Sequence, residues 1–239
     1  MYNPKFPYKE IKRQEVEGKR LYATPDGKKV PSVTTILSAT VPEEKKKILR
    51  EWKARVGVEK AQAITTEAAN RGTKMHKYLE DYVKGDPFPE PPKNIFHLPS
   101  HAMAKTIIDQ GLVNVNEVWG TEVPVYFPGI YAGTTDLAGV HTNDEAIMDH
   151  KQSNRVKKAE WIDDYKIQLC AYAEAHNEVY GTKIKKGVVF MAVKPRVDES
   201  TGNLLSPPIY QEFIIEGADF AYWTKEWWKR VEQYYTLNT

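Results

Sequence analysis

The chain has 239 residues, 41% of them hydrophobic and 28% charged, with a formal net charge of +2. This length and apolar content suffice for a single large domain with its own core, and we expect residues 1–239 to form one. The near-neutral total lacks the basic excess of many nucleic-acid-binding domains, so any basic surface must be local. No apolar run is long enough to span a bilayer, so no contact with a membrane is expected.

The N-terminal stretch and the cysteine content indicate where the protein works. MYNPKFPYKEIKR lacks the apolar region of a secretory signal, so a cytoplasmic location is expected. The single cysteine, Cys170, fits a reducing compartment and excludes an internal disulfide. One cysteine is also too few for a four-cysteine iron–sulfur cluster or a zinc ribbon, so neither is expected.

Residues 1–111 predict a hairpin followed by a wall of helices. The sequence PDG at 25–27 is a strong turn between two short extended runs. Proline and two acids at 42–44 favour the first turn of a helix over Glu43–Val56, which Gly57 ends. Its three lysines at 45–47 are most simply a solvated face, and a DNA-facing role is the alternative.

A second helical region is expected over Val58–Val83, with an interruption near residues 70–72. Met75 and Leu79 give this region an apolar stripe, and His76 lies beside the stripe. A histidine in that position is most often structural, and a metal ligand is the alternative. A proline-rich connector over Gly85–Pro99 then leads to a helix that starts at Ser100.

Residues 112–239 predict the central sheet. Val123, Val125 and Phe127 alternate with polar positions, so Glu122 is expected on the opposite face, toward a site. A helix is expected over Ala159–Tyr180. Two antiparallel strands are expected over Gly187–Val193 and Ile209–Ile215, and a terminal helix over Ala218–Tyr235. The aromatic residues that repeat at helical spacing in this last helix are predicted to be buried in the core.

The stretch GTTDLAGVHTNDEAIMDHKQ, residues 133–152, carries the chemistry. Two strands joined by a polar turn would bring Asp136 of the first strand near Asp149 of the second. Lys151 follows Asp149 by two residues, so both side chains point to the same face of a strand. Two carboxylates and an ammonium make a poor core but a good site for a hard divalent cation beside a phosphate.

Several segments in this order resemble the PD-(D/E)XK nuclease superfamily, in its RecB-like branch. Within that branch the chain is most similar to the mitochondrial genome maintenance exonuclease family and to related phage and bacterial exonucleases. The resemblance covers most of the chain and rests on the segments RLYATPDGKKVPSVTTIL, RGTKMHKYLEDY, TEVPVYF, GTTDLAG, MDHKQS, YKIQLCAYAEA and YWTKEWWKRVEQYY.

The resemblance implies roles for individual residues. His76, Asp136 and Asp149 fall on metal ligands of the branch, and Lys151 on its catalytic lysine; the carbonyl of His150 is a further expected ligand. Three more positions match residues that flank the site or touch DNA: Glu122, whose role is the least certain, Gln168 and Tyr172. Three positions depart from the usual pattern, namely Thr135, His150 and Gln152.

The expected fold is therefore α/β: a small mixed central sheet flanked by helices, a restriction-endonuclease-like core over 112–239, with the N-terminal helical wall over 1–111. The expected function is a metal-dependent DNA exonuclease in replication, repair or recombination. It would use one or two Mg²⁺ or Mn²⁺ ions on single-stranded DNA or frayed ends, in a bacterial or phage-infected host cell. Phosphate contacts are expected from Lys74, Lys77, Arg155, Lys157 and Lys158.

Two alternatives stay open. The first is a structure-specific or restriction-like endonuclease of the same superfamily. The second is a non-catalytic DNA-binding module on a decayed nuclease fold, against which the intact set of Asp136, Asp149 and Lys151 argues.

Overall fold

The computed structural model describes residues 2–16, 19–198 and 200–238. A five-stranded sheet in the order β4-β5-β6-β7-β8 forms its centre. Neighbouring strands are antiparallel except for β6 and β7, which are parallel, so the sheet is mixed. Its strands are β4 (Val115–Phe127), β5 (Tyr131–His141), β6 (Asp144–Ser153), β7 (Lys186–Val193) and β8 (Ile209–Glu216).

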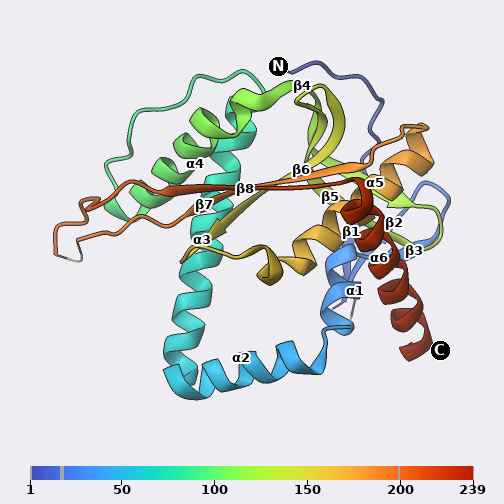
Figure 1. Cartoon of the computed structure of the whole chain (residues 1–239), viewed down its shortest axis with the longest axis horizontal. Coiled ribbons are helices and arrows are strands. Elements are labelled where there is room, and N and C mark those ends of the chain that lie inside the picture. The colour runs from blue at the N-terminus through green and yellow to red at the C-terminus, as the bar shows by residue number, and fades with distance from the viewer. Residues whose placement is uncertain (1, 17–18, 199, 239) are drawn as a thin grey trace.

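Helices cover both faces of this sheet (Figure 1). One face packs against α4 (Leu98–Gln110) and the C-terminal half of α3 (Val58–Val83), around a core that includes Met75, Leu79 and Phe190. The other face packs against α1 (Val33–Ala39), α5 (Asp163–Tyr180) and α6 (Gly217–Leu237). The predicted α/β fold, with a small mixed sheet flanked by helices, is therefore confirmed.

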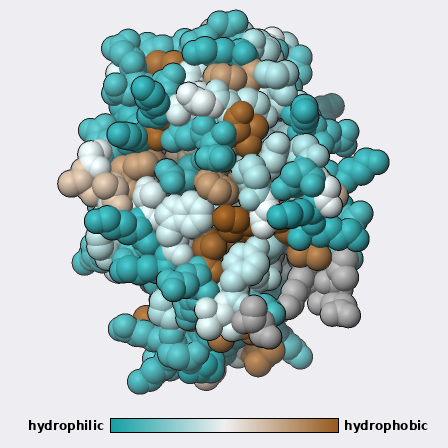
Figure 2. Space-filling view, turned by 90° about the vertical axis from the view of Figure 1, so that its right-hand side faces the viewer, coloured by the Kyte–Doolittle hydropathy of each residue, from teal (hydrophilic) through white to brown (hydrophobic). Residues whose placement is uncertain are grey.

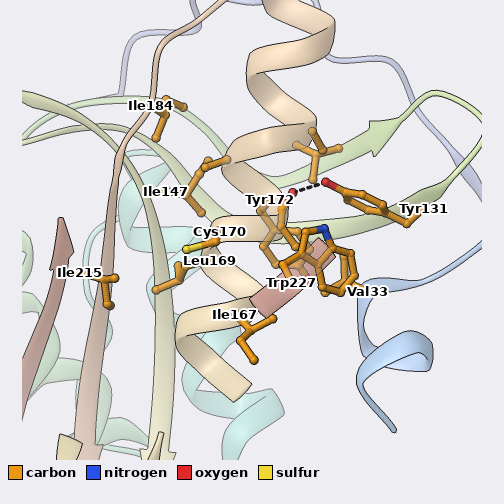
Figure 3. Close-up of a cluster of buried hydrophobic side chains, with 14 of the residues drawn as sticks. Val33, Tyr131, Ile147, Ile167, Leu169, Cys170, Tyr172, Ile184, Ile215 and Trp227 are labelled. Carbon is orange, nitrogen blue, oxygen red and sulfur yellow. Dashed lines mark hydrogen bonds between the residues drawn. The ribbon is translucent and has the colours of Figure 1, made fainter. Parts of the chain in front are cut away.

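The core on the α5 side is rich in aromatic residues (Figure 3). Trp227 of α6 is fully buried, and its ring meets the ring of Tyr131 edge to face at 4.8 Å between centroids. The hydroxyl of Tyr131 donates a hydrogen bond to the carbonyl of Ala171 at 2.9 Å, which satisfies the one polar atom of that buried ring. The expectation that the aromatic stripe of the terminal helix is core is confirmed.

A second, three-stranded antiparallel sheet precedes the helices. It consists of β1 (Lys12–Val16), β2 (Lys19–Ala23) and β3 (Lys29–Pro31). The predicted turn at 25–27 joins β2 to β3, and Gly27 adopts the left-handed conformation there, with φ of 79°. Ile11, Tyr22 and Val30 pack together on Ala132 of β5, so this sheet is anchored beside the central sheet.

The N-terminal helical wall consists of α2 (Glu43–Val56) and the helix that follows it. The predicted boundaries of α2 are confirmed, and Gly57 separates it from α3 at φ of 90°. None of the residues of α2 is buried, and Figure 1 shows it set apart from the sheet, joining α1 to the far end of α3. Figure 2 shows the side of the molecule on the right of Figure 1, where polar side chains dominate and apolar ones form small groups.

Three expected helix boundaries were wrong. The interruption near residues 70–72 is absent and α3 is continuous, because Arg71 turns inward and hydrogen-bonds to β6 instead of breaking the helix. The helix expected from Ala159 begins at Asp163, after a short 3₁₀ turn over Ala159–Trp161. Two further 3₁₀ turns flank α4, at Ile95–His97 and Leu112–Asn114, and α4 itself begins at Leu98 instead of Ser100.

Candidate active site

Three carboxylates stand in line across three neighbouring strands. The pairing of β5 with β6 runs from His141/Asp144 to Leu137/Met148, so the next residues along the two strands are Asp136 and Asp149. On the other side, the pairs Thr121/Leu137 and Val123/Thr135 place Glu122 opposite Asp136. Like charges placed side by side on a sheet repel one another, so this row needs a compensating cation.

His76 reaches the same row from α3. Its Nδ1 lies 3.4 Å from Oδ1 of Asp136, whose other oxygen accepts a 2.6 Å hydrogen bond from the backbone N–H of His150. His76, Glu122 and Asp136 each offer a ligand atom, and these atoms lie within 4.8 Å of one another. Carboxylate oxygens and an imidazole nitrogen are a donor set suited to Mg²⁺ or Mn²⁺, so the residues fit the expected ion.

Glu122 is held in an unusual backbone conformation. Its φ of 51° lies in the left-handed region, which non-glycine residues rarely adopt inside a strand. Such backbone strain persists only where surrounding structure imposes it, and it is often found at functional sites. The sequence pattern predicted that Glu122 faces the site, and the structure brings it into the candidate ligand group instead of a more distant substrate contact.

Lys151 lies next to Asp149, as predicted. Its ammonium forms an ion pair with Oδ2 of Asp149 and sits 5.0 Å from the ring centroid of Tyr165. Asp149 is nearly fully buried, and its Oδ2 is the atom that pairs with this ammonium. The buried carboxylate therefore already has one cationic partner, and a metal ion bound beside it would be a second.

The pKa values of these groups reflect their crowding. Burial, with the charge of Asp136, raises the pKa of Glu122 to about 7. Burial and Asp136 also raise the pKa of Asp149, against the opposing effect of Lys151. Burial would raise the pKa of Asp136 as well, but the cations of His76, His150 and Lys151 outweigh it and the pKa is lowered. The row therefore reaches its full negative charge most easily when a cation is bound.

His76 owes its position to a hydrogen-bond network between α3 and β6. The Arg71 side chain is buried and donates to Oε1 of Gln152 from Nε and Nη2, at 3.1 and 2.8 Å, and also to Asn154 and Glu67. The amide of Gln152 in turn donates to the carbonyl of Ala68 at 3.1 Å. Gln152, one of the positions that depart from the usual pattern, thus links α3 to β6.

Two adjoining cavities open onto the row. The outer cavity, of about 700 Å³, lies along α3 and includes His76, His150 and Lys151 in its wall. The inner cavity, of about 270 Å³, lies over Asp136 and Asp149. The two cavities share Arg13, Glu122 and Lys151 as lining residues, so they adjoin along the carboxylate row.

The helix residues implied by the resemblance also line this space. Gln168 and Tyr172 face the inner cavity, and the amide of Gln168 donates to the Tyr172 hydroxyl at 2.9 Å. Gly133 makes room for them, because a Cβ there would lie 2.6 Å from the Tyr172 ring.

The predicted phosphate-binding cations are mostly elsewhere. Lys74 lines a separate cavity, Arg155 lies over the ring of Trp161 at 5.6 Å, and Lys158 lies over the same ring at 5.4 Å. The backbone N–H of Lys157 donates to Gln211, away from both cavities. Lys77 does line the outer cavity, although its ammonium pairs with Asp81 at 2.6 Å.

Three residues at the site escaped the sequence analysis: Arg13, Arg71 and Tyr165. Tyr165 precedes Gln168 by three positions, so helical spacing alone places it near a recognised residue, whereas Arg71, five positions before His76, falls outside that spacing. Arg13 has no such signal, because it lies in an irregularly patterned N-terminal stretch.

Comparison with known proteins found distant relatives of the chain. No family model matches the chain. It is similar to mitochondrial genome maintenance exonuclease 1 of Mus musculus, with 26% identity over 215 residues, 86% of this chain and 59% of that protein. The resemblance to the PD-(D/E)XK nucleases is confirmed. The proteins of the same name from Xenopus tropicalis and Homo sapiens are each 24% identical over 216 residues, with 86% of this chain covered and 57% and 58% of the relatives.

The chain thus spans less than two thirds of the length of these exonucleases. They come from vertebrates, so they lend no support to the predicted bacterial or phage-infected host. A crystal structure of a proposed exonuclease from Eubacterium rectale superposes with a TM-score of 0.46 and 18% identity, over 70% of this chain and 64% of that one. Among the described residues, no helix has the length and apolar character needed to cross a membrane.

Proposed function

We propose that this protein is a metal-dependent DNA exonuclease that acts on single-stranded DNA or frayed ends during replication, repair or recombination. The observation that carries the proposal is the carboxylate row of Glu122, Asp136 and Asp149, with His76 on one side and Lys151 within it. The similarity to proteins named as exonucleases supports the nuclease chemistry.

The residues of the row have separable tasks in phosphodiester hydrolysis. His76, Asp136 and Glu122, with Asp149 beside them, would hold one or two Mg²⁺ or Mn²⁺ ions, and the His150 carbonyl is a further proposed ligand. Bound there, the metal supplies neutralisation of the phosphate charge and an acidified water. Lys151 presents an ammonium to the phosphate or to the attacking water and stabilises negative charge as it develops. Tyr165 packs against that ammonium and limits where it can lie.

The position of α3 supports a preference for single strands. This helix carries His76 directly over the carboxylates and forms a wall of the outer cavity, so the site is approached between α3 and the sheet. A flexible single strand can enter such a space and be held by phosphate contacts, whereas a rigid duplex is excluded. An enzyme that admits its substrate by threading needs a free end, which favours the exonuclease over the endonuclease alternative.

The test compares linear and circular forms of one single-stranded oligonucleotide, end-labelled where possible, at equal concentration with Mg²⁺, Mn²⁺ or excess EDTA. We expect rapid shortening of the linear form, little attack on the circle, slower attack on blunt duplex and no cleavage in EDTA. Equal cleavage of line and circle would replace the exonuclease by an endonuclease. Full activity in EDTA would refute the metal chemistry, and DNA binding without cleavage in either metal would favour the non-catalytic module.

A further inference from the structure

Arg13 is a cation of the active-site space to which the catalytic chemistry gives no task. It lines both the outer and the inner cavity, together with Glu122 and Lys151. In the part of the chain that the structure describes, its guanidinium has neither a hydrogen bond nor an ion pair. It also lies too far from the carboxylates of the row to form an ion pair with any of them.

The fold of the small N-terminal sheet places Arg13 there. Side chains alternate between the faces of a strand, so Arg13 shares a face with Ile11 and has Tyr22 as its partner on β2. Ile11 and Tyr22 are buried against Ala132 of β5, which anchors this face of the sheet beside the catalytic strands. Lys12, the preceding residue, belongs to the opposite face and lines neither cavity.

The surroundings of Arg13 define what it can bind. An arginine offers a planar fork of N–H donors that suits the paired oxygens of a phosphate, and its charge persists at any working pH. The carboxylates that line this space belong to the metal-binding row, except Glu80, which pairs with Lys84, and Lys151 is paired with Asp149. Arg13 is therefore the cation of the shared wall that remains available, among the described residues, for an anion brought in by a ligand.

We propose that Arg13 binds a backbone phosphate of the DNA next to the phosphate that is cleaved, and so fixes the register of the strand across the carboxylate row. This assignment rests on the proposed nuclease function. The scissile phosphate belongs at the metal ligands and Lys151, whereas Arg13 comes from the separate N-terminal sheet and lines the cavities on both sides of the row, so we assign it a neighbouring phosphate. The subsite recognises the phosphodiester backbone and carries no base preference.

Binding measurements test the assignment without requiring cleavage. Arg13→Gln, Arg13→Lys and the matched control Lys12→Gln are compared by fluorescence anisotropy of a labelled single-stranded oligonucleotide in Ca²⁺, after thermal melts confirm that each variant is folded. We expect Arg13→Gln to weaken binding about tenfold and to lower the salt slope by about one, and Arg13→Lys to recover part of the affinity. Lys12→Gln should stay within about twofold of the unaltered protein.

Neutral phosphates identify the partner of Arg13. Oligonucleotides that carry a single methylphosphonate at successive positions around the first cleavage site are bound and cleaved by the unaltered protein and by Arg13→Gln. At one position beside the scissile phosphate, the methylphosphonate should weaken binding and cleavage by the unaltered protein about tenfold, but should cause almost no further loss in Arg13→Gln. The assignment would be overturned if the methylphosphonate weakened Arg13→Gln as much as the unaltered protein at every position. Equal loss of affinity in Arg13→Gln and Lys12→Gln would also overturn it.

The outcomes also separate this subsite from the function on which it rests. If Arg13→Gln binds and cleaves linear DNA as the unaltered protein does, the nuclease function stands and the phosphate subsite is refuted. If the unaltered protein binds single-stranded DNA through Arg13 but cleaves no DNA, the subsite stands and the nuclease function is refuted.

Discussion

Asp149 and Lys151 lie two residues apart on β6 and form an ion pair, yet their proposed tasks differ. The carboxylate is buried and lies beside Asp136 in the row, which suits a metal ligand. The ammonium sits between that carboxylate and the ring of Tyr165 and lines both cavities, which suits contact with the substrate. Substituting the two residues one at a time therefore distinguishes the negative charge that would bind the metal ion from the positive charge that would act on the phosphate.

Asp149→Asn should remove metal binding together with cleavage, because it deletes a ligand charge. Lys151→Ala should lower cleavage by at least about 10²-fold, because it removes charge stabilisation in the transition state, and should leave Mn²⁺ binding measurable by titration calorimetry. Thermal melts of both variants provide the folding control. Equal loss of metal by the two variants would make Lys151 part of the metal-site architecture instead of the chemistry.

At the scale of elements, the decisive pairing is that of α3 with β6. The C-terminal half of α3 buries Met75 and Leu79 in the core, whereas α2, which precedes it, buries none of its residues. Between α2 and this buried half of α3, Arg71 hydrogen-bonds to Gln152, the residue that follows Lys151. This link holds α3 against β6 and so fixes where His76 lies relative to the carboxylates.

Arg71→Ala should therefore lower the free energy of unfolding by about 2 kcal/mol, because it removes the hydrogen bonds that the buried guanidinium donates to the half-buried Gln152 and to Asn154. It should also weaken Mn²⁺ binding, since His76 is then less firmly placed. Urea unfolding and calorimetry measure the two effects. Lys60→Ala, an exposed change on the same helix, is the control and should alter neither quantity. A stability for Arg71→Ala equal to that of the control would contradict this account.

At the scale of the whole molecule, aromatic packing holds the N-terminal segment around Phe6 and Tyr8 against the central sheet and α5. The ring of Phe6 meets the rings of Trp119 and His176 edge to face, at centroid distances of 5.3 and 5.1 Å. The two nitrogens of the fully buried His176 lie 2.9 Å from the Tyr8 hydroxyl and 2.8 Å from Oγ1 of Thr182. Tyr8 and Thr182, which lie far apart in the sequence, thus both hydrogen-bond to the same neutral imidazole.

Acidification should lower the stability that this packing around His176 provides. Burial lowers the pKa of His176 to about 4, below the value of about 6.5 expected for the unfolded chain. Between these two values the unfolded state binds more protons, so stability falls as pH falls through this window. For this histidine alone, unfolding at pH 5 should require about 2 kcal/mol less than at pH 7.5.

Chemical denaturation of the unaltered protein and of His176→Gln between pH 7.5 and pH 5 measures this contribution. The variant should be less stable at neutral pH, yet its stability should decline less on acidification, by about the amount that His176 contributes. If the free energy of unfolding fell equally with pH in the two proteins, the folded state would accept a proton on His176 as readily as the unfolded state, and this account would be wrong.

The sequence alone determined the local pieces of this protein. The PDG turn, the limits of α2, the aromatic face of α6, and the placing of Asp149 and Lys151 on one strand face follow from propensities and spacings that act over a few residues. The motif order then indicated the superfamily, and with it the residues from His76 to Tyr172 that belong near the site.

Only the tertiary structure decided what lies opposite what. Glu122 joins the ligand group because the register of β4 on β5 sets it opposite Asp136, and register depends on contacts between distant segments. Arg71 continues a helix where the local pattern predicted a break, since a partner on β6 offsets the local preference. Arg13 reaches the site only because Ile11 and Tyr22 pack on Ala132, a contact between segments more than a hundred residues apart that no short-range pattern records.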